Sequence, residues 1–145
     1  MARTCYALKL GENTYKLRLT LKGQKVLRAL DPDAPILAAV VGAVDDPDTM
    51  EALLTEALNW KGNDNKLHDG AELYDEMVDN GYSGSEDFLK VVLNIAENAG
   101  LLTEVERIKV ERSTGKLLRA AMENFDDEEE GEESPENPLK DLKTL

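Results

Sequence analysis

The sequence is poor in the side chains that form disulfides, bind metals or act as nucleophiles. In 145 residues it contains one cysteine, Cys5, and one histidine, His68. A lone cysteine forms no disulfide within the chain, and a single histidine without a cysteine cluster gives no zinc-binding spacing. This cysteine usage is typical of the reducing cytoplasm, which is where we expect the protein to work.

Long hydrophobic runs are missing as well. The longest apolar stretch, Pro35–Val44, is about half as long as the ~20 residues that span a bilayer. The first residues, Met1–Leu10, carry Arg3 and Lys9 without the apolar core of a signal peptide between them. We therefore expect a soluble protein that contacts no membrane.

Basic residues are too few to balance the acidic ones. The chain has 17 Lys and Arg against 30 Asp and Glu, for a net charge of -13. The segment from Glu123 to the end holds 10 acidic and 2 basic residues, so it carries -8 of that charge. Because nucleic-acid binding draws most of its affinity from cations on phosphates, this balance argues against a DNA or RNA partner.

Sequence signatures of catalysis are also lacking. The chain has no glycine-rich phosphate loop, nucleophile elbow or paired-histidine motif. A calcium loop starting at Asn65 places Gly70 sixth but Leu67 third, where an oxygen ligand is required. Paired carboxylates such as Asp45 and Asp46 are typical of helix caps and solvated faces in so acidic a chain. We predict that the protein is not an enzyme and uses no cofactor or metal.

Two short alternating stretches open the sequence. Cys5–Leu10 and Tyr15–Leu19 flank the polar connection Gly11–Thr14. In the second stretch Tyr15, Leu17 and Leu19 share one face, and the basic residues Lys16 and Arg18 share the other. This period of two predicts a β-hairpin with one apolar face, which needs a helix to cover it because an isolated hairpin is marginal in water.

The rest of the chain reads as helices separated by turn residues. Thr20, Asp46 and Ser85 are predicted N-caps, and a capping box of Thr103 with Glu106 opens the last helix. The predicted helices cover 20–30, 36–44, 46–58, 73–80, 85–99 and 103–125. We predict a mainly α (α+β) fold, in which the hairpin packs on a bundle of five to six helices within residues 1–123.

The segment Ile36–Val44 is apolar on all sides, so a helix here is either central to the core or covered by a partner. A bundle of this size has room for one central helix, which favours the core interpretation. The alternative is a groove for a partner helix. The residues predicted to contribute to such a groove are Leu37, Val40, Val41 and Val44.

The C-terminal segment 124–145 is predicted to be a flexible acidic tail, because 126–136 is acidic and has no aliphatic residue. Leu139, Leu142 and Leu145 follow at intervals of three, which places them along one side of a short helix. Two interpretations stand open: a solubilising tail, or a docking peptide on an acidic tether.

The order of these parts resembles the tail assembly chaperones of long-tailed phages of Gram-positive bacteria. The similarity covers about residues 4 to 102. It rests on the hairpin end Tyr15–Thr20 leading directly into a helix, and on the strings Glu72–Met77, Gly81–Ser85, Val91–Ile95 and Ala99–Leu102. Asp31–Ala43 is richer in alanine and valine than the family pattern.

The resemblance implies a protein that coats the aggregation-prone tape-measure protein before the tail tube polymerises, and that is absent from the finished virion. It also implies a long frameshifted form that engages the tail tube protein, and self-association is compatible with such a role. A different class of function also fits the composition: an acidic adaptor or inhibitor that occupies a basic protein surface.

Overall fold

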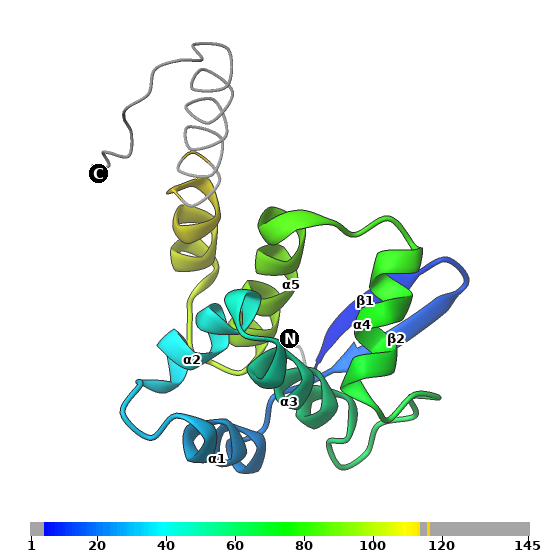
Figure 1. Cartoon of the computed structure of the whole chain (residues 1–145), viewed down its shortest axis with the longest axis horizontal. Helices are drawn as coiled ribbons and strands as arrows, with labels where there is room; N and C mark the ends of the chain where they lie inside the picture. The colour runs from blue at the N-terminus through cyan, green and yellow to red at the C-terminus, as the bar shows by residue number, and fades with distance from the viewer. Residues whose placement is uncertain (1–4, 114–115, 117–145) are drawn as a thin grey trace, which may run out of the picture. The chain divides into compact units, whose positions relative to one another are not determined.

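A computed structural model describes residues 5–113 and 116. The chain divides into two compact units, Met1–Glu111 and Arg112–Leu145. The fold below is that of the first unit (Figure 1). The predicted tail 124–145 and its three leucines, Leu139, Leu142 and Leu145, lie outside the described residues.

The unit begins with the predicted hairpin. Strands β1 (Tyr6–Leu10) and β2 (Asn13–Leu17) pair antiparallel, with Leu8 opposite Tyr15. The connection is two residues long, shorter than the expected Gly11–Thr14, and Gly11 has a φ of 62°. Two-residue hairpin loops require positive φ, which glycine adopts without steric cost, so β2 starts earlier than the alternation suggests.

Five α-helices and one 3-10 helix follow among the described residues, and 104–113 is helical as well. Their bounds are α1 Leu21–Leu30, α2 Ile36–Gly42, the 3-10 helix η1 Ala43–Asp45, α3 Pro47–Leu58, α4 Gly70–Asp79 and α5 Gly84–Asn98. The predicted fold class, a hairpin on a helical bundle, is confirmed. None of these described helices is long and apolar enough to cross a membrane.

Local capping sets most of the helix boundaries. The Thr20 hydroxyl accepts from a backbone N–H in the first turn of α1, and Asp46 does the same for α3, with Pro47 at the first helical position. Thr103 and Glu106 form the predicted reciprocal capping box, with bonds of 2.9 and 3.1 Å. The prediction of Ser85 as an N-cap is wrong by two residues: the N-cap of α5 is Ser83, whose backbone N–H donates to Asp87 Oδ2, and the helix begins at Gly84.

The core lies between the hairpin, α3 and α5. The buried face of the hairpin consists of Leu8, Leu10, Tyr15 and Leu17. Helix α3 contributes the predicted stripe of Met50, Leu53, Leu54, Ala57 and Leu58, all buried. Seven residues of α5 are buried, more than in any other of the helices described here, and α5 packs on α2, η1 and β1 (Figure 1). Burial of these apolar side chains is the main favourable contribution to folding.

Helix α2 is therefore not the central helix that the apolar segment Ile36–Val44 suggests. It spans only seven residues, and of these Ala39 and Val40 are buried while Gly42 is exposed. Leu37 and Val41 are partly buried against the core. Helix α5 is twice as long as α2 and buries seven residues, while one side of it, including Lys90, stays exposed.

The long connection between α3 and α4 is fastened to the hairpin by side chains. The Trp60 indole donates to the Lys16 carbonyl at 2.9 Å, and the Arg18 guanidinium lies 5.7 Å from the centre of the Trp60 ring. Asn65 is buried. Its side-chain oxygen accepts from the Lys16 N–H and its side-chain nitrogen donates to the Lys16 carbonyl, both at 2.7 Å. An irregular loop thus satisfies the outer edge of β2, which pairs with no further strand in the described part of the chain.

Helix α4 is joined to β2 by Tyr15, whose hydroxyl donates to Glu76 Oε1 at 2.7 Å. Burial, followed by this carboxylate, raises the pKa of Tyr15 from 10.0 to about 12. The folded state thus favours the neutral phenol. The stability that this buried, hydrogen-bonded phenol contributes is complete below pH 10 and is lost as the pH rises through about 12.

We therefore expect Tyr15→Phe to lose stability less steeply than the wild type between about pH 10 and pH 12. At neutral pH the variant should lose about 1 kcal/mol, because one hydrogen bond is missing. Urea midpoints measured across this pH range check both expectations. Parallel curves for the two proteins would contradict the link between Tyr15 ionisation and unfolding.

Candidate partner-binding groove

A hollow of about 460 Å³ opens where η1, the start of α3 and the first turns of α4 meet. Most of its wall is apolar, and three carboxylates stand among the apolar side chains. The lining residues are Ala43, Val44, Asp45, Pro47, Met50, Glu51, Ala71, Tyr74 and Asp75. We call this hollow the α3–α4 groove. An apolar wall of this kind accepts apolar side chains from a partner.

The close approach of α4 to α3 forms one side of the groove. Gly70 starts α4, and its backbone N–H donates to the Thr55 hydroxyl at 2.8 Å. A Cβ atom at Gly70 would lie 2.3 Å from the Glu51 carbonyl oxygen and 2.7 Å from the Thr55 nitrogen. Only glycine allows two helix backbones to pass this closely, so this residue sets the distance between the walls that carry Glu51 and Ala71.

Tyr74, in the α4 wall, is held in place by a second aromatic ring. Its ring stacks on Phe88 of α5, with centroids 4.6 Å apart and planes 9° from parallel. The Tyr82 ring also lies against Phe88, with the two ring centroids 6.1 Å apart. Aromatic stacking of this type fixes the ring orientation, so this side of the groove is preformed.

The groove is negatively charged at its edge. Asp45, Glu51 and Asp75 are exposed, and within the described part of the chain none of them takes part in an ion pair. Free carboxylates beside an apolar hollow favour a ligand that combines apolar side chains with Lys or Arg at its flanks. An amphipathic helix with basic flanking residues has this composition.

The structure separates the four residues predicted for a groove on Ile36–Val44. Val44 lines the α3–α4 groove. Leu37 and Val41 pack partly buried against the core, and Val40 is 0% exposed. The prediction that Val40 contributes to a binding surface is therefore wrong, because its side chain has no free face. A charged residue at this position would disrupt the core before it disturbed a partner.

Most of the groove was not visible as a site in the sequence. Tyr74 belongs to the helical stripe of α4 and reads as a core residue, and Asp75 reads as a solvated carboxylate. The signal for a site is their combination with Val44 and Met50, which lie far away in the chain. Periodicity within one helix carries no information on that combination.

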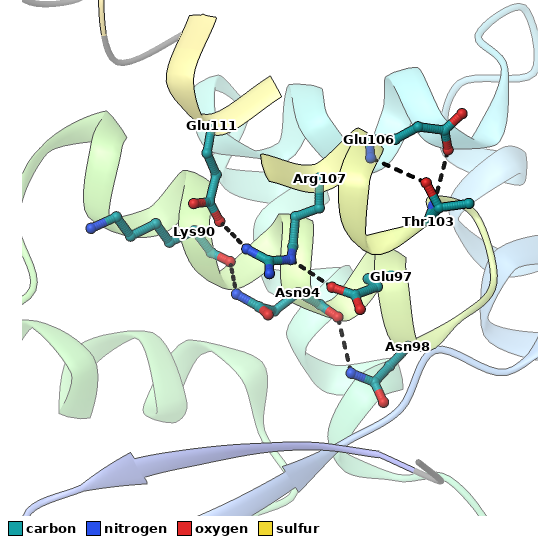
Figure 2. Close-up of polar contacts among 8 residues, drawn as sticks. All are labelled: Lys90, Asn94, Glu97, Asn98, Thr103, Glu106, Arg107 and Glu111. Carbon is teal, nitrogen blue, oxygen red and sulfur yellow. Dashed lines mark hydrogen bonds and ion pairs between the residues drawn. The ribbon is translucent and has the colours of Figure 1, made fainter. Parts of the chain in front are cut away.

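A second hollow, of about 530 Å³, is polar and contains Arg107. Figure 2 shows this guanidinium between two carboxylates: its Nε lies 2.5 Å from Glu97 Oε1 and its Nη1 lies 2.9 Å from Glu111 Oε2. The hydrogen bond to Glu97, and then those to Glu111, raise the pKa of Arg107 above its usual value. Its charge is already compensated, so this arrangement fastens the helical segment 104–113 to α5 and leaves little for an anionic ligand.

The residues considered for catalysis are distributed without a common site. His68 is exposed and its Nδ1 lies 2.8 Å from Asn59 Oδ1, while Asp69 caps α4. Cys5 is half-buried at the start of the hairpin. In residues 5–113 and 116 no three His, Cys, Asp or Glu side chains are grouped so that they could hold a metal ion. That the protein is not an enzyme stays a prediction.

Comparison of the chain with protein-family models, with curated proteins and with solved structures finds no match.

Proposed function

We propose that this protein is a tail assembly chaperone that binds helical segments of the tape-measure protein before the tail tube polymerises around it. The observation that carries the proposal is the α3–α4 groove, which combines an apolar wall with three carboxylates that form no ion pair among residues 5–113 and 116. The order of hairpin and helices, similar to that of such chaperones, supplies the identity of the client. On this proposal the protein acts in the bacterial cytoplasm and does not remain in the virion.

The groove is suited to weak and reversible binding. It is small, so it holds a few apolar side chains and leaves the rest of a client helix in contact with other copies or with water. A long client offers many such segments, and many weak contacts together retain it while each one remains displaceable by the tube protein. The net charge of -13 keeps coated clients apart by like-charge repulsion.

The first experiment measures the soluble fraction of the tape-measure protein from the same genome, with and without co-expression of this chain. We expect the client to move from the pellet to the supernatant and to elute together with the chaperone. A client that stays insoluble while this chain elutes alone would overturn the proposal.

The groove itself is tested by reversing its charge. In the double variant Glu51→Lys, Asp75→Lys, two exposed groove carboxylates become cations that repel the basic flanks of the client. We expect the affinity for a client helix to fall about tenfold, from two surface charge contacts of up to about 1 kcal/mol each. Isothermal titration with a peptide from the tape-measure protein measures this change.

The matched control is Glu12→Lys, Asp79→Lys, which changes the net charge equally at two exposed residues outside the groove. Asp79 lies on α4 one turn beyond Asp75, so each pair changes one residue of this helix. The control should bind the client like the wild type. Equal losses in both doubles would mean that overall charge, and not the groove, holds the client.

Salt distinguishes this proposal from an acidic adaptor that occupies a basic surface. Ion pairs at exposed surfaces are screened within about 8 Å at physiological ionic strength, while apolar contacts are not weakened by salt. We therefore expect a modest change in client affinity between low and high salt. A steep loss of affinity at high salt would favour the adaptor.

A further inference from the structure

Helix α1 differs in charge from the rest of the chain. Residues 13–30 contain five basic residues and no acidic one, although the whole chain carries -13. Three of the five, Lys22, Lys25 and Arg28, lie on α1 and are exposed. No described carboxylate forms an ion pair with any of these three, and Arg28 donates to the Pro32 carbonyl.

The same helix exposes large apolar side chains. Leu21 is 67% exposed, Leu30 is 53% exposed and Val26 is 38% exposed. Only Gly23 and Leu27 of this helix are buried. Single exposed apolar residues are ordinary on protein surfaces. Leu21 lies about half a turn around the helix from Leu30, and on the same side as Lys25 and Arg28, four and seven residues further on. Leu21 is therefore the large apolar side chain of the basic side of α1.

The packing of α1 explains why this side stays open. Helix α1 contacts α2 and α3 and lies at the edge of the unit (Figure 1). A Cβ atom at Gly23 would lie 3.1 Å from the Glu56 Cβ of α3, so the glycine side of the helix is pressed against its neighbour. At about 100° per residue, Leu21, Lys25 and Lys22 lie on the arc of the helix away from Leu27.

We propose that the exposed face of α1 is a second docking surface, and that its partner is an acidic amphipathic helix of another protein with leucine-type side chains between Asp and Glu. Charge complementarity carries this choice, because the face offers only cations and apolar groups. A phosphate backbone would also meet the cations but offers no apolar side chain to the exposed Leu21, and an anionic membrane is one outcome of the tests below. Basic client segments fit the α3–α4 groove, so the two surfaces select ligands of opposite charge.

The probe is a labelled synthetic helical peptide with leucines at every third or fourth position among glutamates, and without Lys or Arg. Fluorescence anisotropy with the full chain should show saturable binding. Replacing the leucines of the peptide by serine, or its glutamates by lysine, should abolish it. Absence of binding to the full chain would overturn the proposal.

Two variants of the full chain locate the contact on α1. Leu21→Ser removes the exposed leucine of this face and Lys22→Glu, Lys25→Glu reverses its charge, and each variant should weaken binding at least about tenfold. The controls Val78→Ser and Lys66→Glu change an exposed apolar residue and an exposed cation elsewhere, and should bind the peptide like the wild type. Circular dichroism confirms folding of all four, and equal loss in the controls would overturn the assignment to α1.

Two further measurements test the other occupants. If the peptide binds only after Leu139, Leu142 and Leu145 are replaced by serine, the face belongs to the chain's own C-terminal segment and the partner proposal is overturned. Sedimentation with phosphatidylglycerol vesicles that depends on Lys22 and Lys25 would overturn it in favour of a lipid surface. Failure of these tests leaves the client experiments on the α3–α4 groove unaffected, because the two surfaces share no residue.

Discussion

Replacing Gly70 by alanine is expected to lower the free energy of unfolding by about 3 kcal/mol, near the upper end of overpacking effects. The added Cβ would lie 2.3 Å from the Glu51 carbonyl oxygen and 2.7 Å from the Thr55 nitrogen, both backbone atoms. Since backbone atoms of a packed helix cannot turn away as a side chain does, α4 must shift from α3. For a domain of this size, such a loss lowers Tm by more than about 10 °C.

The same shift should weaken client binding. Glu51 and Ala71 form opposite walls of the α3–α4 groove beside Gly70, so a wedge between the helices changes its width. Urea unfolding gives the loss of stability, and titration with the client peptide at a temperature where the variant is folded gives the loss of affinity. Wild-type stability in Gly70→Ala would mean that α3 and α4 do not approach as closely as described.

The matched control is Gly42→Ala, for which the expected change has the opposite sign. Gly42 is right-handed helical, with φ -67° and ψ -14°, and a Cβ atom there would meet nothing within 4 Å. Alanine restricts the unfolded chain without strain in the folded one, so the variant should gain about 0.5–1 kcal/mol. Together the two variants separate steric contact at Gly70 from the general effect of replacing a helical glycine.

The second large effect is expected for Asn65→Asp. The Asn65 amide nitrogen donates to the carbonyls of Lys16 and Leu58 at 2.7 and 3.0 Å, and its oxygen accepts from the Lys16 N–H at 2.7 Å. Aspartate keeps the acceptor but turns a second oxygen, charged at neutral pH, toward two carbonyl oxygens in a buried place. We expect a loss of about 3 kcal/mol at pH 7, since an unsatisfied buried charge costs more than a neutral group.

This loss should depend on pH in a defined direction. The folded state disfavours the ionised form of the introduced carboxyl. The loss in free energy of unfolding is therefore greatest at pH values above the carboxyl's unfolded pKa of about 4, and it is relieved below that pKa. Urea midpoints of the variant relative to the wild type at pH 7 and near pH 4 measure this.

Asn94→Asp is the control, because the Asn94 side chain is partly exposed and its amide donates only to the Lys90 carbonyl of its own helix. It should lose less than about 1 kcal/mol at either pH. Equal losses in the two variants would show that the buried network around Asn65 has no special importance for the hairpin.

Local structure followed closely from local sequence. The alternation around Tyr15 and Leu17 predicted a strand with one buried face, and the side chains of Thr20 and Asp46 predicted the starts of two helices. These features depend on neighbours within about four residues, which the sequence displays directly. The errors were equally local: the hairpin loop has two residues, fewer than expected, and Gly11 in it has the positive φ that such a turn uses.

The choice among apolar segments did not follow from the sequence. Ile36–Val44 has the most continuous apolar run, yet α5 buries more residues than α2, and Val40 is buried while Val44 lines the groove. Burial of apolar surface stabilises the fold for every such segment. Which segment is buried most depends on the lengths and contacts of all the others. Composition alone therefore identified the apolar residues and favoured their place in the core, where Val40 and Ala43 lie, but it did not show that Val44 lines a groove.

By itself, the sequence determined the acidic charge, the hairpin, the helices and their caps, because each arises from composition or from short-range periodicity. Only the tertiary structure decided that η1, α3 and α4 bring Val44, Glu51 and Tyr74 to one groove. It also decided that Gly70 sets the width of that groove and that α1 keeps its basic face uncovered. The physical reason is that binding surfaces form where distant elements pack together, and side-chain contacts between such elements leave no periodic trace in the chain.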